Sequence, residues 1–231
     1  MTPLKRSRAA LVALLSAGGL ALPAVATVAA APAPAALPGK AIGAEIDPWQ
    51  ALSELRLHLA ASGSLVAGFK QSYVPAGFAT GDEESGRVAM ALPDCLRWDY
   101  AEPYPKSYLL CGSRLHTWVG GEPQGERLHV EAREEAGLDL LLLSVELLKA
   151  RYSAVARPES GGRIAVQLQP TAPASRIAQA TLVFDPSTQR PTALDYRDRE
   201  GNVTQFRFTT FELLDDPGLF APPATLIWKE P

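Results

Sequence analysis

The fold of this chain is decided by residues 86–119, which read GRVAMALPDCLRWDYAEPYPKSYLLCGSRLHTWV. Apolar and polar residues alternate along this stretch, and prolines and glycines separate the alternating runs. Because successive side chains of a strand point to opposite faces, the pattern predicts consecutive antiparallel strands with one apolar face. The residues expected on that face are Val88, Met90, Leu92, Leu96, Trp98 and Tyr100.

More strands are expected on both sides of this stretch. Their ranges are 65–73, 106–111, 163–169, 177–184, 192–197 and 203–212, and the last of them adds Phe206 and Phe208 to the apolar face. Gly77, Gly81 and the acidic residues 82–84 predict a turn before the strand that carries Val88. Short strands that follow one another so closely predict an antiparallel sheet that curls.

Two helices are expected besides the strands. Residues 47–62 place Leu52, Leu55 and Leu59 on one face, and Asp47 or Ser53 can cap the helix before Gly63 ends it. Residues 138–149 form the second helix, whose stripe of Leu140, Leu143 and Leu147 is thickened by further leucines. A helix this apolar is not an ordinary surface helix.

The apolar face of the sheet can be covered in two ways. A second sheet would give a sandwich or a closed, packed barrel. A leucine-rich helix laid across a curved sheet would instead cover the concave face without filling it, and it would leave an apolar cavity of the kind that binds small ligands. The helix at 138–149 favours the second arrangement.

The N-terminus predicts export. Lys5, Arg6 and Arg8 precede an apolar run from Ala9 to Leu22 and then small residues, which is typical of a secretory signal peptide. The apolar run is shorter than the roughly 20 residues of a membrane-spanning helix. We therefore expect a signal peptide at 1–30, an Ala/Pro-rich disordered segment at 31–46, and one exported, soluble domain at 47–231.

Composition limits the classes of function. The chain has 231 residues, 47% of them hydrophobic, and a formal net charge of −3. Without the three basic residues of the leader, 19 basic residues face 25 acidic ones, which gives −6. Nothing in this balance favours nucleic acid or an anionic membrane surface as a partner.

Two groups of residues together resemble a known family. The first consists of Gly86, Pro93, Trp98, Pro103 and Gly112. The second consists of Leu182-Val183-Phe184-Asp185, Pro191, Leu194, Asp198, Gly201-Asn202, Thr204, Phe206, Phe208, Leu219-Phe220 and Pro222-Pro223. In order and spacing, over about Gln50 to the C-terminus, they resemble the LolA family of periplasmic outer-membrane lipoprotein carriers.

This resemblance implies a mainly β fold with α: an incomplete, half-open antiparallel β-barrel with a helical lid over an apolar cavity. It implies a periplasmic monomer that is not an enzyme, has no cofactor or metal, and shelters the acyl chains of lipoproteins between the two membranes. The implied partners are acylated lipoproteins, an inner-membrane ABC-type lipoprotein-releasing complex and an outer-membrane receptor. The expected acyl-binding face is Val88, Met90, Leu92, Leu96, Trp98, Tyr100, Phe206 and Phe208, closed by the lid residues Leu140, Leu143 and Leu147.

The chain departs from the family pattern at two positions. Well-studied members have an arginine before the proline that matches Pro93, and this arginine is thought to latch the lid, whereas the present chain has Leu92. Arg87 and Arg97 are nearby substitutes, but Arg97 has the wrong parity to share the face of Trp98. The second departure is Cys111, where an Asp-Gly turn is more usual.

The two cysteines are expected to form a disulfide. If the turn centres on Pro103, facing residues have numbers that sum to 206, which pairs Trp98 with Tyr108 and Cys95 with Cys111. Opposed cysteines on neighbouring antiparallel strands lie near the separation that a disulfide accepts. In an exported protein with two cysteines, a structural bond on the convex side is favoured over a free pair or a metal site.

Alternative functions remain open at the level of sequence. One is a periplasmic lipid or lipoprotein sensor built on a similar half-barrel, although such regulators usually have a second domain. Another is an enzyme acting on acyl lipids, which would need a nucleophile elbow or an acid/base constellation that the sequence lacks. His58, His116 and His129 lack the spacing of a zinc site or a triad and are expected at the surface.

Overall fold

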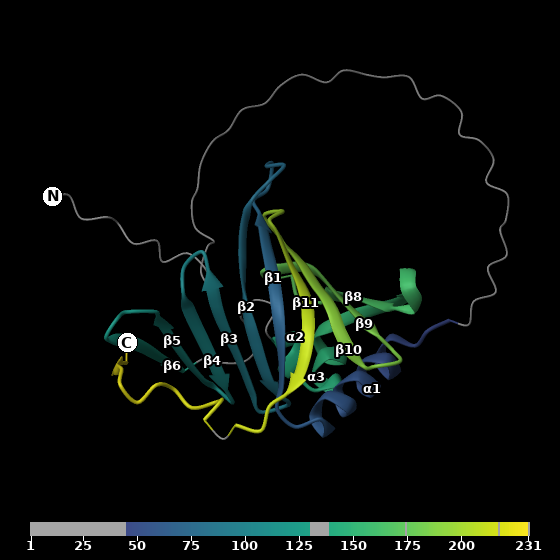
Figure 1. Ribbon diagram of the computed structural model, residues 1–231. Coiled ribbons are helices and arrows are strands. Elements are labelled where there is room, and N and C mark those ends of the chain that lie inside the picture. Colours follow the sequence, from purple (N-terminus) through teal and green to yellow (C-terminus); the bar gives the residue numbers. More distant parts are fainter. Residues whose placement is uncertain (1–44, 130–138, 174, 217, 231) are drawn as a thin grey trace, which may run out of the picture. The chain divides into compact units, whose positions relative to one another are not determined.

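The structure is a computed structural model that describes residues 45–129, 139–173, 175–216 and 218–230 (Figure 1). The expected signal peptide, most of the segment expected to be disordered, and Leu138 lie outside the described residues. Residues 45–231 cluster as one unit. In the described part of the chain, no helix is long and apolar enough to cross a membrane.

All described strands belong to one open sheet of twelve, whose order is β12-β6-β5-β4-β3-β2-β1-β11-β10-β9-β8-β7. Its first half consists of β1 (Leu65–Val74), β2 (Asp82–Ala91), β3 (Cys95–Glu102), β4 (Lys106–Cys111), β5 (Arg114–Val119) and β6 (Gln124–His129). Its second half consists of β7 (Tyr152–Pro158), β8 (Ile164–Pro170), β9 (Ile177–Asp185), β10 (Arg190–Asp198), β11 (Val203–Leu213) and β12 (Ile227–Lys229). Neighbours are antiparallel except β12, which pairs in parallel with β6.

The register of the central hairpins is the predicted one. Trp98 faces Tyr108 and Cys95 faces Cys111 across β3 and β4. The acidic residues 82–84 were expected in a turn, but they begin β2, where Asp82 pairs with Tyr73. The turn is confined to residues 75–81, where Gly77 has a φ of 83°.

Helix α1 (Pro48–Ala61) matches the expected range. The carboxylate of Asp47 accepts hydrogen bonds from the backbone N–H of Trp49 (2.8 Å) and Gln50 (3.2 Å), so Asp47 rather than Ser53 is the cap. The helix buries Leu52, Leu55 and Leu59. Gly63 takes a φ of 74°, which suits glycine, and the chain turns there into β1.

The single helix expected at 138–149 is wrong. The structure has α2 (Asp139–Leu142) and α3 (Val145–Arg151), with a break at Leu143 and Ser144. Ser144 is extended, and its hydroxyl accepts a hydrogen bond from the backbone N–H of Leu147 at 3.3 Å. It is therefore the N-cap of a new helix, and the leucine stripe starts again in a different register.

The C-terminal segment covers part of the sheet face opposite the helices. Trp228 of β12 packs edge-on against His116 and Trp118. Gly125 makes room for it, since a Cβ there would lie 2.4 Å from the Trp228 ring. His116 was expected at the surface but is only 7% exposed, because this segment lies over it.

Candidate functional site

The candidate site is the inner face of the sheet, which we define as the face on which the helices pack. Of the eight residues predicted there, seven are buried: Val88, Met90, Leu92, Leu96, Trp98, Phe206 and Phe208. Tyr100 is partly buried and packs against the same cluster. The strands are paired so that side chains two apart on β2, β3 and β11 converge on this face.

An aromatic cluster occupies the middle of the inner face. Phe69 of β1 meets Trp98 and Tyr100 edge to face, at centroid distances of 4.9 and 5.0 Å. Trp98 lies 4.8 Å from Phe206, and Phe206 stacks against Phe208. The sequence prediction omitted Phe69, although its position in the alternating pattern of β1 could have indicated it.

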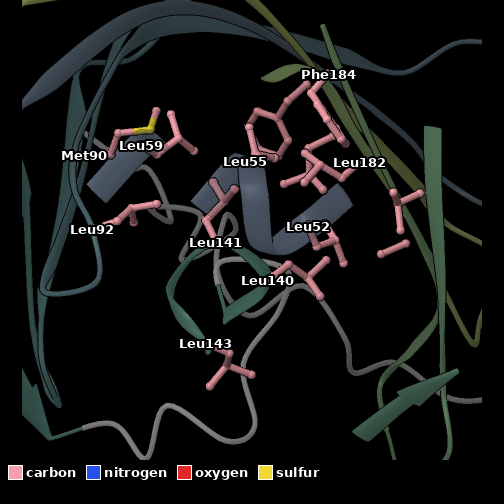
Figure 2. Close-up of a cluster of buried hydrophobic side chains, with 14 of the residues drawn as sticks. Leu52, Leu55, Leu59, Met90, Leu92, Leu140, Leu141, Leu143, Leu182 and Phe184 are labelled. Atoms are coloured by element: carbon pink, nitrogen blue, oxygen red, sulfur yellow. The ribbon is translucent and has the colours of Figure 1, made fainter. Parts of the chain in front are cut away.

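Helix α1 lies directly on the inner face. Figure 2 shows Leu52, Leu55 and Leu59 pointing into the cluster beside Leu182, Phe184 and Met90. Leu55 is 1% exposed and Leu59 is 2% exposed. The sequence predicted this helix but gave it no role in the site, although its leucine spacing showed an apolar face that needed a partner.

The second covering layer is the lid, which we define as residues 139–151 of α2 and α3. Leu140 and Leu143 are buried against the α1 leucines, as predicted (Figure 2). Leu147 is 46% exposed and does not close the inner face, because the new register that starts at Ser144 turns it outward. Leu141 and Leu148, which were not in the predicted set, are 2% and 1% exposed and take that place.

The inner face is filled rather than hollow beneath these helices. Side chains that border a water-sized cavity retain accessible area, yet the residues of the cluster that Figure 2 labels are all buried. The expected empty apolar cavity is therefore not present among the described residues of this face. Leucines of α1 and the lid occupy the place where a guest chain was expected.

One arginine joins the two covering layers. Arg56 of α1 donates hydrogen bonds from its Nη1 atom to the backbone oxygens of Leu140 (3.2 Å) and Leu141 (2.7 Å). Burial lowers the pKa of Arg56, and nearby Glu146 partly offsets this. An arginine nevertheless stays charged in proteins. Charge-assisted bonds to the last carbonyls of α2 thus tie the lid to α1.

The arginines considered beside Leu92 do not reach the lid. Arg87 is exposed and forms an ion pair with Glu212. Arg97 forms an ion pair with Asp99 and donates to the backbone oxygen of Leu219 on the outer face. Leu92 itself is 8% exposed within the apolar cluster. Sequence reasoning therefore missed Arg56, which sits one position after the buried Leu55.

The inner face becomes polar at the end away from the helices. Lys106 forms an ion pair with Glu84, and both side chains are only about 15% exposed. Glu84 also accepts from Gln71 at 3.3 Å, and Gln71 accepts from the Tyr100 hydroxyl at 2.6 Å. The ammonium of Lys106 lies 4.5 Å from the Tyr100 ring centre. We call Gln71, Glu84, Tyr100 and Lys106 the polar collar.

Three tyrosines of this region are held neutral. Burial raises the pKa of Tyr100 well above its ordinary value, and Tyr196, Glu84 and Tyr108 add to the shift. Burial, followed by Glu84, raises the pKa of Tyr108 to about 12. Burial likewise raises the pKa of Tyr196 to about 12. Their hydroxyls therefore remain hydrogen-bond donors at neutral pH.

The predicted disulfide is present between Cys95 and Cys111, whose Cα atoms lie 4.2 Å apart. Its residues have the opposite parity to Leu96 and Leu110, so the bridge lies on the outer face of β3 and β4. Across the described ranges, no three His, Cys, Asp or Glu side chains are grouped so that they could hold a metal ion.

Comparison with known proteins identifies the family. The family model described as "Outer membrane lipoprotein carrier protein LolA" matches residues 60–220. The chain belongs to the LolA family. The match spans every strand of the sheet except β12, and it includes the lid of this LolA-family protein.

Individual relatives agree with this assignment. An outer-membrane lipoprotein carrier protein of Dechloromonas aromatica (strain RCB) is 26% identical, over 75% of this chain and 85% of its own length. One of Shewanella frigidimarina (strain NCIMB 400) is 27% identical, over 68% and 73%. Among solved structures, an uncharacterized conserved protein from Thermus thermophilus has a TM-score of 0.51 at 11% identity, covers 79% of this chain and 98% of its own, and supports the fold alone.

Proposed function

We propose that this LolA-family protein is a periplasmic carrier that shelters the acyl chains of lipoproteins on the inner face and transfers them from the inner to the outer membrane. The observation that carries the proposal is the covering of that face. Its aromatic and aliphatic side chains are closed by short helices rather than by a second sheet, and helices can be displaced while the sheet stays intact. The disulfide suits the oxidising periplasm.

The filled interior makes loading an exchange. Sheltering a chain of about fifteen methylenes is worth roughly 12 kcal/mol before ordering costs. Displacing three leucines of the lid costs about 5 to 9 kcal/mol of their burial. The difference is small enough for a carrier that must release its cargo. On this view the structure is the unloaded, closed form, and Arg56 is the latch that must let go.

The partners follow from the same proposal. An inner-membrane ABC-type lipoprotein-releasing complex would supply the energy for loading, and an outer-membrane receptor would accept the cargo. The protein would act as a monomer by binding alone, without catalysis or a cofactor. Hydrocarbon and aromatic side chains dominate the inner face, and they offer affinity for a lipid tail rather than chemistry on it.

The test is capture and transfer. Purified protein is incubated with inner-membrane preparations that carry a triacylated lipoprotein, and the released complex is then offered to outer membranes. We expect a stoichiometric complex and onward transfer. Capture without transfer would favour the sensor alternative, and consumption of the lipid would favour an enzyme. Absence of capture with a competent preparation would refute the carrier.

A further inference from the structure

The outer face of β5 and β6 carries four basic side chains in a two-by-two arrangement. Arg114 faces His129 across the two strands, and His116 faces Arg127. Side chains two apart on a strand share a face, and cross-strand partners lie about 5 Å apart at Cβ. The net charge of the chain is negative, so this grouping comes from the fold and not from composition.

A cleft of about 640 Å³ opens at this grouping. Its basic side is formed by Arg114, His116, Arg127 and His129, with Ser113 in the β4–β5 turn. Its apolar side is formed by Leu109 of β4 and by Phe220 and Pro222 of the C-terminal segment. The cleft lies on the sheet face opposite the inner face, since Leu109 alternates with Tyr108 and Leu110 along β4.

The positive charge of the cleft is only partly neutralised. Arg127 forms an ion pair with Glu230 at 3.2 Å, and the Glu230 side chain is 70% exposed. In the part of the chain that the structure describes, no carboxylate pairs with Arg114. The Nε atom of Arg127 donates to Nε2 of His116 at 3.3 Å, which places the His116 proton on Nδ1 and keeps the ring neutral.

The Glu230 contact indicates the chemistry that the cleft accepts. A carboxylate of the chain itself already uses one guanidinium, through a single contact at the rim. Arg114, Ser113 and His129 remain as donors around the same cleft. A carboxylate has two acceptor oxygens, whereas a phosphate group offers three strong ones and matches the fork of arginine.

We propose that this cleft binds a phosphate group, with Arg114 and Arg127 as its charge partners and with Glu230 as an internal competitor. The apolar side formed by Phe220 and Pro222 suits a phosphate that carries a hydrocarbon portion. The group can come from a soluble phosphorylated ligand or from a phospholipid headgroup. The site is independent of the carrier proposal, because it lies on the other face of the sheet.

The test titrates the full-length mature protein with inorganic phosphate at low ionic strength and follows the imidazole NMR signals of His116 and His129. We expect a saturable shift that weakens roughly ten-fold in Arg114→Gln and Arg127→Gln and strengthens in Glu230→Gln. Arg87→Gln is the matched control, because Arg87 is an exposed arginine outside the cleft. Arg114→Gln is the cleaner variant, since Arg127 also contacts His116.

The proposal is overturned if phosphate on the order of 10 mM shifts neither histidine. It is equally overturned if Arg114→Gln and Arg87→Gln weaken the shift to the same extent, because the effect would then be general charge. Co-sedimentation with phosphatidylglycerol vesicles, compared with phosphatidylcholine vesicles, separates the two sources. Vesicle binding that is lost in Arg114→Gln assigns a lipid headgroup, and phosphate binding without vesicle binding assigns a soluble ligand.

Discussion

At the scale of single residues, Arg56 contributes most to the state of the lid. Its guanidinium is held between α1 and the end of α2, and it satisfies two carbonyl oxygens there. The short helix α2 has few other ways to satisfy its last carbonyls away from water. A change of this one side chain should therefore loosen the lid without touching the sheet.

Arg56→Met tests this role, because methionine keeps the apolar stem and removes both hydrogen bonds. We expect the free energy of unfolding to fall by about 1.5 to 3 kcal/mol, as for a hydrogen bond to a charged group. We expect amide hydrogen exchange of 145–151 to accelerate while that of β1 and β11 stays slow. Arg87→Met is the control. Unchanged exchange in α3 would contradict a latch at Arg56.

His116 makes the outer-face packing sensitive to pH. Burial lowers its pKa, and Arg127 and Arg114 lower it further. In the unfolded chain the pKa is about 6.5, so protonation favours unfolding. The stabilising contribution is fully present above that value and is lost as the pH falls below it toward the folded pKa, by at most about 1.4 kcal/mol per pH unit.

The measurement compares urea unfolding of the wild type with that of His116→Gln between pH 7.5 and pH 5. We expect the wild type to lose more stability than the variant as the pH falls. The carboxylates common to both proteins cancel in this difference. Curves that stay parallel over the whole range would show that His116 does not titrate with folding.

At the scale of elements, the alternation of side chains in β2, β3 and β4 was enough to predict the strands, their register and the inner-face residues. The disulfide followed from that register. The break in the lid did not follow from the leucine count, because Ser144 is a weak signal beside so many leucines. Its hydroxyl caps a new helix, so Leu147 and Leu148 exchange their expected places.

The edges of the sheet were also beyond the sequence prediction. β7 and β12 are short edge strands whose pairing depends on partners distant in the chain. The site was predicted least well where it depends on packing between elements. Neither the filling of the inner face by α1 nor the reach of Arg56 to α2 can be read from a local pattern, since both require the relative positions of helices.

The disulfide is predicted to stabilise the β3–β4 hairpin through the unfolded state. The bond closes a loop of 16 residues, for which chain entropy gives about 3 kcal/mol. The double variant Cys95→Ala/Cys111→Ala should therefore unfold at lower urea with a similar two-state transition. Equal midpoints for the oxidised wild type and the double variant would contradict this contribution.

At the scale of the whole molecule, the two faces of the sheet have different chemistry. The inner face joins an apolar part under the helices to the polar collar at the other end. A guest tail that replaces the leucines would leave its ester groups nearer the donors of the collar. The outer face is tied down by the disulfide and by the C-terminal segment, so opening of the lid need not disturb it.

The exchange of leucines for cargo is tested with two leucines of the lid. Leu143→Asn places an amide where the side chain is 6% exposed, whereas Leu147→Asn makes the same change where it is 46% exposed. We expect Leu143→Asn to lower stability by about 2 to 5 kcal/mol and to capture much less acylated lipoprotein. Leu147→Asn should stay close to the wild type in both measurements.

Stability and capture must be read together, because a buried amide weakens the closed protein as well as the loaded one. Cooperative urea unfolding first establishes that Leu143→Asn is folded at the temperature of the assay. A folded Leu143→Asn protein that captures lipoprotein as well as the wild type would show that the cargo does not replace this leucine. Loss of capture in Leu147→Asn to the same extent would instead place the contact on the exposed side of the lid.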